Sequence, residues 1–146
     1  MSLCTVDALA DSIRLSDRGV RVNMVPDQHN GKSDHSIASA TCNVRVNQRQ
    51  VMLHFAATPF VHVDDSRIKN NAMLSATVSR QLGQIVVSPQ AIADRTNISN
   101  DDEQATIAVG VSGNGRAQVQ LQVGIDANNA HAGRHCTTVV MTVTAN

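Results

Sequence analysis

Apolar and polar residues alternate with a period of two along most of this chain. In the segment 117–125, for example, Val119, Leu121 and Val123 are separated by glutamine residues. Because successive side chains of a strand point to opposite faces, this period is typical of antiparallel strands with one buried face. The same alternation recurs in residues 20–24, 37–46, 51–56, 73–78, 85–87, 105–111 and 137–145. The sequence therefore predicts an all-β fold.

Turn-forming residues separate several of these runs. Ser112–Gly115 contains Asn-Gly, which readily adopts the positive φ of a tight turn, and it predicts a hairpin between the runs on either side. Helix signals are few, and Pro89–Arg95 is the segment expected to form a helical turn. Seven or more short strands at this spacing favour an antiparallel sandwich or barrel. We expect one domain over residues 1–146.

Side-chain composition restricts the functions to expect. Phe55 and Phe60 are the only aromatic residues among Phe, Tyr and Trp, so the core must be built from small and β-branched side chains. The same shortage argues against a site that stacks bases or sugars on rings. The 12 basic and 12 acidic residues give a formal net charge of zero. This balance implies neither a cationic surface for nucleic acid nor an acidic tail.

The sequence contains no motif that declares a catalytic, metal or cofactor site. His131 and His135 have helical spacing within a glycine-containing turn, and a zinc site needs further converging ligands. We expect them to be solvated loop histidines. The acidic runs Asp64–Asp65 and Asp101–Glu103 lack the spaced oxygen ligands of a calcium loop and are expected to be solvated turns. The prediction is a protein that is not an enzyme and holds no metal and no cofactor.

The three cysteines, Cys4, Cys42 and Cys136, leave two interpretations open. In a cytosolic chain they are buried free thiols, whereas in an exported chain two of them form a disulfide and one thiol is left over. Cys42 lies 38 positions after Cys4, a spacing that suits a first strand joined to a neighbouring strand. Such a crosslink would contribute on the order of 3–4 kcal/mol through chain entropy.

Both ends of the chain carry short motifs of one known family. The first is Cys4-Thr5-Val6, and the second is Gly133, fourteenth from the C-terminus, followed by the alternating strand that ends in Thr-Val-Thr-Ala-Asn. In these motifs the chain resembles the pilin subunits of chaperone–usher fimbriae, and its Cys-Thr-Val opening is similar to the spore-coat-U-like pilins. It departs from the family at Ala145, where a penultimate tyrosine is usual. This departure puts recognition of the C-terminal strand by the chaperone in doubt.

The resemblance implies an immunoglobulin-like sandwich that lacks its last strand and is completed by a donor strand from a neighbouring subunit. It implies a Cys4–Cys42 disulfide, with Cys136 left over, and a C-terminal assembly motif that includes Gly133 and Ala145. The apolar groove for the donor strand would be lined from the first and last strands. Its expected lining residues are Ile13, Leu15, Val139, Met141 and Val143.

The leading hypothesis is a structural or adhesive fimbrial subunit that is exported through the periplasm to the cell surface. Its implied partners are neighbouring pilus subunits, a periplasmic chaperone, an outer-membrane usher and a host receptor, with no nucleic acid. Only three residues precede Cys4, so we interpret residues 1–3 as added, and either the donor segment was removed or the chain is a domain cut from a larger adhesin. An isolated subunit with an empty groove is then expected to form a strand-swapped dimer.

Two other functions fit the same pattern. One is a stand-alone ligand-binding β-sandwich of a surface or virion protein. The other is an enzyme whose residues are scattered over loops. A closed sandwich would place the expected groove residues in an ordinary core, and this interpretation stays open from sequence position alone.

Overall fold

The computed structural model describes residues 4–7, 13–17, 19–27, 37–125 and 133–146. Within these residues the alternating runs form strands, and the regular helical structure is one short 3-10 helix, η1 (Ile98–Asn100). The strands are β1 (Cys4–Asp7), β2 (Ile13–Asp17), β3 (Val20–Pro26), β4 (Ile37–Ala57), β5 (Phe60–His62), β6 (Lys69–Asn70), β7 (Ala72–Ser88), β8 (Ala91–Arg95), β9 (Ala105–Ile125), β10 (Gly133–Cys136) and β11 (Val139–Ala145).

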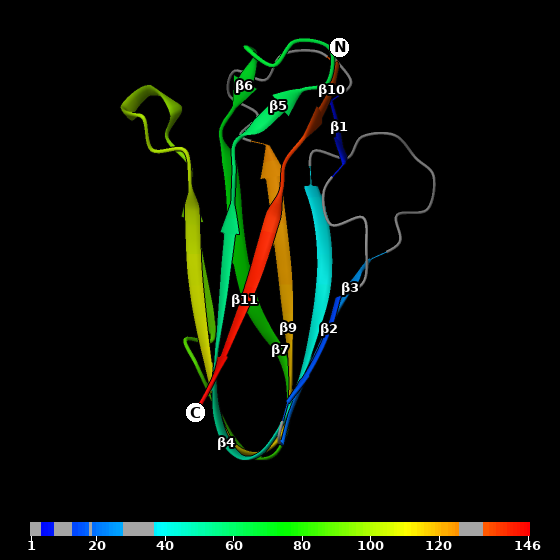
Figure 1. Ribbon diagram of the computed structural model, residues 1–146, viewed down its shortest axis with the longest axis vertical. Helices are drawn as coiled ribbons and strands as arrows, with labels where there is room; N and C mark the ends of the chain where they lie inside the picture. The colour runs from blue at the N-terminus through cyan, green and yellow to red at the C-terminus, as the bar shows by residue number, and fades with distance from the viewer. Residues whose placement is uncertain (1–3, 8–12, 18, 28–36, 126–132) are drawn as a thin grey trace.

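The larger sheet has the order β2-β3-β4-β9-β7-β8, and β11 pairs with β4. Three of its strands are long, with 21 residues in β4, 21 in β9 and 17 in β7. The first part of β4 pairs with β3 and its last part pairs with β11, while β9 runs antiparallel to β4 along its whole length. Figure 1 shows all three long strands turning sharply at the lower end of the molecule.

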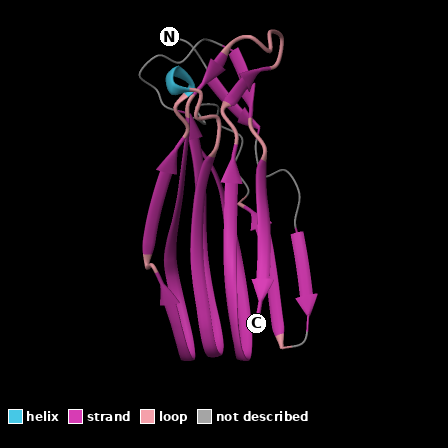
Figure 2. Cartoon of the chain, turned by 60° about the vertical axis from the view of Figure 1, so that its left-hand side comes forward, coloured by secondary structure: helices cyan, strands magenta, loops and turns pink. Residues whose placement is uncertain are grey.

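This turn folds one continuous sheet into two facing layers. The first layer contains the early halves of β4 and β7 and the late half of β9. Strands β2 and β3 lie beside β4 in this layer, and β8 lies beside β7. In the second layer the remaining halves are flanked by β11. Figure 2 shows the long strands running along the molecule, with η1 and short strands at the end away from the turn. The expected all-β, antiparallel sandwich is confirmed.

The buried positions show how each strand keeps its apolar face inward through the turn. In β4 the buried residues have even numbers from Ala38 to Val46 and odd numbers from Val51 to Ala57. A β-bulge at Gln48, which has φ 51°, inserts the extra residue that changes the parity. A second register shift between Val78 and Arg80 does the same in β7. The strand between them, β9, keeps its parity: odd-numbered residues are buried from Ala105 to Val111 and again from Ala117 to Ile125.

Two local predictions are wrong. Ser112–Gly115 does not form a hairpin: it lies within β9, and both sides of it continue along the same neighbours, β4 and β7. The positive φ in this segment belongs to Gly113 and not to the Asn-Gly pair, and the sheet bends there instead of ending. Pro89–Arg95 does not form a helical turn, because Ala91–Arg95 is strand β8, paired with the start of β7.

The smaller sheet has the order β1-β10-β5-β6 and lies at the end of the molecule away from the turn (Figure 1). Its strands β1 and β10 are parallel, with Cys4 opposite Gly133 and Asp7 opposite Cys136. Gly133 of the second family motif therefore lies beside the first motif, whereas the alternating strand that follows it, β11, pairs with β4 in the larger sheet. The core contains both phenylalanines, and most of its other residues are valine, alanine, leucine and isoleucine. No helix in the described part of the chain is long and apolar enough to cross a membrane.

Candidate functional site: the open side of the sandwich

One long side of the sandwich is bordered by two edge strands. Among the described strands, β2 pairs only with β3 in the first layer, and β11 pairs only with β4 in the second. Each therefore presents one row of backbone N–H and C=O groups to which no described strand pairs. Such rows are the usual points of attachment for a further strand.

A cavity of about 240 Å³ opens between these edge strands. Five of its six lining residues are apolar, and they come from both layers and from both ends of the chain. The lining consists of Leu15, Ser16, Val20, Val22, Val143 and Ala145. Leu15 stands opposite the buried Val22, on the inward side of β2, yet its side chain is 42% exposed. The core is thus incompletely covered on this side.

The inward side chains of β11 lead to the same conclusion. Val139, Met141, Val143 and Ala145 pack against the core but are only partly buried. The corresponding residues of β4, such as Leu53 and Phe55, are almost fully buried. β11 covers Leu53 and Phe55 from one side, but no described strand pairs with the other edge of β11. The inward side chains of β11 are therefore exposed along that edge. An extended segment placed beside β11 would cover it.

The structure brings together part of the residue set expected from the sequence. Leu15 and Val143 line one cavity although they are far apart in the chain, and Ala145 lines it with them. Val139 and Met141 share the inward face of β11. Ile13 stands opposite Met24 in β2, and its side chain lies outside the described part of the structure. Gly133 is not part of this side, because it belongs to the smaller sheet.

The expected Cys4–Cys42 disulfide is not present in the structure. Cys42 is a free and fully buried thiol, placed between Met24 of β3 and Val119 of β9, and burial raises its pKa to about 12. Cys4 belongs to β1, in the other sheet, where β10 is its neighbour. A spacing of 38 residues therefore did not identify adjacent strands. Cys136 is a free thiol of intermediate burial.

The histidines are arranged differently from the prediction of solvated loops. His135 is fully buried in β10, and its ring meets that of His62 edge to face, with ring centres 5.0 Å apart. His131 lies outside the described residues. In the described part of the chain no three His, Cys, Asp or Glu side chains form a group that could hold a metal ion.

The acidic runs lie in exposed segments, as expected. Asp65 accepts hydrogen bonds from the guanidinium and the backbone N–H of Arg67, which hold the pKa of that carboxyl below its usual value. Glu103 forms an ion pair with Lys69 at 2.7 Å. These contacts stabilise turns at the surface and suggest no chemistry.

Sequence reasoning missed a row of arginines on the outward face of the first layer. Arg21, Arg45 and Arg116 stand directly opposite one another on β3, β4 and β9. In the adjacent row lie Arg14 of β2 and Arg80 of β7. The sequence does contain the signal, an arginine at an outward position of several alternating strands. The missing information was which strands are neighbours and in what register. A net charge of zero therefore does not exclude a local row of arginines.

Comparison with family models, with curated proteins and with solved structures finds no match for this chain.

Proposed function

We propose that this chain is a structural or adhesive fimbrial subunit that accepts an extended strand from a neighbouring subunit on the open side between β2 and β11. The observation that carries the proposal is the apolar cavity between two edge strands, lined by Leu15 and Val143 among others. Export to the cell surface, and a chaperone and usher as assembly partners, belong to the same proposal.

An extended segment is the occupant that suits this side best. Its backbone would hydrogen-bond to the open edge of β11, and every second side chain would point into the apolar gap. A globular partner could cover the apolar residues but would leave most of the edge N–H and C=O groups without strand-like partners. The strand that the resemblance implies is missing would lie beside β11.

The free thiol at Cys42 removes the disulfide from the features shared with the fimbrial family. The proposal therefore depends on the open side and not on the cysteines.

Ala145 is consistent with the proposal in a different way. Its small side chain lines the cavity and leaves room that the usual tyrosine of the family would occupy.

The test is strand addition by a synthetic peptide of about seven residues in which valine and threonine alternate, matched to the 7 residues of β11. The peptide is expected to raise the melting temperature of the wild-type chain, because it binds only the folded state. Val143→Arg places a charge at the cavity and should abolish this rise. Val140→Arg is the matched control, since Val140 lies on the outward face of β11 and is 54% exposed.

A peptide effect that survives Val143→Arg, or that is lost equally in Val140→Arg, would show that binding occurs elsewhere. If no alternating peptide shifts the melting temperature at millimolar concentration, the side is closed in solution and the proposal fails.

A further inference from the structure

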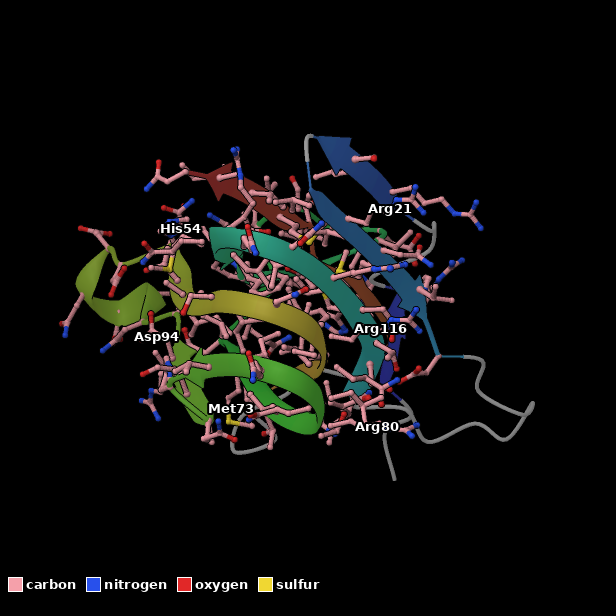
Figure 3. All side chains as sticks on the ribbon, turned by 90° about the horizontal axis from the view of Figure 1, so that it is seen from below. Arg21, His54, Met73, Arg80, Asp94 and Arg116 are labelled. Carbon is pink, nitrogen blue, oxygen red and sulfur yellow. The ribbon has the colours of Figure 1, made fainter. Side chains whose placement is uncertain are left out.

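The zero net charge of this chain conceals a segregation of charge over its surface. Five of the twelve basic residues occupy two adjacent rows on the outward face of the first layer. Five of the twelve acidic residues, Asp64, Asp65, Asp101, Asp102 and Glu103, lie in the loops that follow β5 and η1. On the outward face of the first layer itself, Asp27 accepts hydrogen bonds from Thr41 and Gln120. Figure 3 shows Arg21, Arg116 and Arg80 on one side of the molecule, contributed by β3, β9 and β7.

The first row is unfavourable for folding. Arg21 is opposite Arg45, and Arg45 is opposite Arg116, so three like charges face one another across neighbouring strands. Directly opposed like charges destabilise a sheet. The ion pairs recorded between described residues are Arg67–Asp65 and Lys69–Glu103, and neither includes an arginine of these rows. A feature that costs stability, and that no ion pair between described residues compensates, favours a ligand that supplies the opposite charge.

The second row places amide groups between arginines. From β2 to β7 it consists of Arg14, Asn23, Asn43, Gln118 and Arg80. Nε2 of Gln118 donates a hydrogen bond to Oδ1 of Asn43 at 3.2 Å. Oδ1 of Asn23 is buried and has no hydrogen-bond partner among the described residues, so the row retains an unsatisfied acceptor. Guanidinium groups suit anionic oxygens, whereas amides and an open acceptor suit hydroxyl groups.

The two rows surround a shallow cavity. It has a volume of about 410 Å³, and its lining includes Arg21, Arg45, Arg80, Arg116 and the three amide residues of the second row. Neighbouring strands are about 4.8 Å apart, so the arginines of the first row extend over roughly 10 Å across the sheet. One small anion cannot contact all of them. A chain that carries repeated negative groups, lying across the strands, can.

We propose that this surface, the arginine face (Arg14, Arg21, Arg45, Arg80 and Arg116), binds an anionic polysaccharide that carries sulfate or carboxylate groups. Guanidinium groups beside amide groups match a polymer that carries anionic groups beside hydroxyls. Single-stranded nucleic acid is the rival polyanion, and proteins that bind it usually stack its bases on aromatic side chains. Phe55 and Phe60, the only such residues in the chain, are both buried in the core.

The experiment uses heparin as the sulfated probe, polygalacturonate as the carboxylated probe and neutral dextran as the uncharged control. Affinities are measured by titration calorimetry at low salt and again at increasing salt. Wild-type protein is expected to bind at least one of the charged polymers and not dextran. Affinity should fall as salt rises, because binding releases the counterions of the polymer.

The double variant Arg45→Gln, Arg116→Gln removes two charges from the centre of the face. Each guanidinium makes charge-assisted contacts, so their loss should weaken the wild-type affinity at least about tenfold. Arg95→Gln is the matched control: Arg95 is exposed on β8 and lies outside the arginine face. It should stay within about twofold of wild type. Retention of the fold is checked by the melting temperature of each variant.

Three results would overturn the proposal. The first is no binding of either charged polymer at low salt, and the second is an equal loss of affinity in Arg95→Gln. The third is tighter binding of single-stranded oligothymidylate than of a polysaccharide of equal charge, which would assign the face to nucleic acid instead.

Discussion

The turn that folds the sheet in two depends on Gly113, and the substitution Gly113→Ala tests this directly. Gly113 has φ +111°, a conformation that residues with a side chain rarely adopt. A Cβ built on it would lie 2.3 Å from the carbonyl oxygen of Gln84 on the neighbouring strand β7. That oxygen belongs to the backbone of a paired strand, so it cannot move away as the end of a flexible side chain could.

The expected cost follows from these two observations. A non-glycine residue held in such a backbone conformation costs about 1–3 kcal/mol. Relief of the overlap requires β9 and β7 to separate locally, which weakens their hydrogen bonds at about 1 kcal/mol each. Alanine returns about 0.4–1 kcal/mol by restricting the unfolded chain. The net expectation is a loss of about 3 kcal/mol in the free energy of unfolding, which corresponds to about 6–12 °C in melting temperature at this chain length.

Gly110→Ala is the matched control on the same strand. Gly110 has no positive φ, and a Cβ there would meet its nearest atoms, Cε of Met52 and the carbonyl oxygen of Ser88, at an ordinary 3.5 Å. This variant should range from unchanged to about 1 kcal/mol more stable. Both variants are compared with wild type by urea unfolding and by thermal melting followed by circular dichroism. If Gly113→Ala and Gly110→Ala have equal stability, β9 does not turn at Gly113 and the two-layer arrangement derived from it is wrong.

Three further predictions concern the buried thiol, the arginine face and the thiol count. Because burial raises the pKa of Cys42 from 9.0 to about 12, the unfolded chain loses this proton first, so the free energy of unfolding should fall by about 1.4 kcal/mol per pH unit between those values. Cys42→Ala should lack that slope in urea unfolding at pH 8–11, and parallel slopes would contradict the burial. Arg45→Gln should raise the unfolding free energy by a few tenths of a kcal/mol through relief of like-charge repulsion, and a lower urea midpoint would contradict the cost assigned to the row. Ellman titration of the denatured, non-reduced chain should find at least two thiols, whereas one thiol would mean that Cys42 or Cys136 is in a disulfide after all.

The fold class could be predicted because alternation is a local property. A run such as 117–125 buries every second residue whichever strands flank it, so period two was enough to predict strands. Sequence alone could not show that Ser112–Gly115 continues a strand, because a hairpin and a bent strand use the same residues. Whether this segment forms a hairpin or a bent strand depends on whether β4 and β7 also bend at the same place. That bend is a property of three strands together and not of one local sequence.

Part of the candidate site could be predicted for the same reason. Leu15 and Val143 occupy inward positions of terminal strands, and terminal strands are frequently sheet edges. The arginine face and the position of Cys42 could not be predicted, since both depend on which strands are adjacent. Arg45 and Arg116 are 71 positions apart in the sequence, and only the register of β4 with β9 places them opposite each other.

Strand β3 connects the open side with the arginine face. Its inward residues Val20 and Val22 line the cavity beside β11, while its outward residues Arg21 and Asn23 belong to the two rows. A slip of β3 by one residue would exchange the two sets, so both proposed surfaces require the same register. A strand added beside β11 would not cover the outward side of β3. In an assembly formed in that way each subunit would expose one arginine face, and a long anionic polymer that contacts several of them would bind far more tightly than one subunit could hold it.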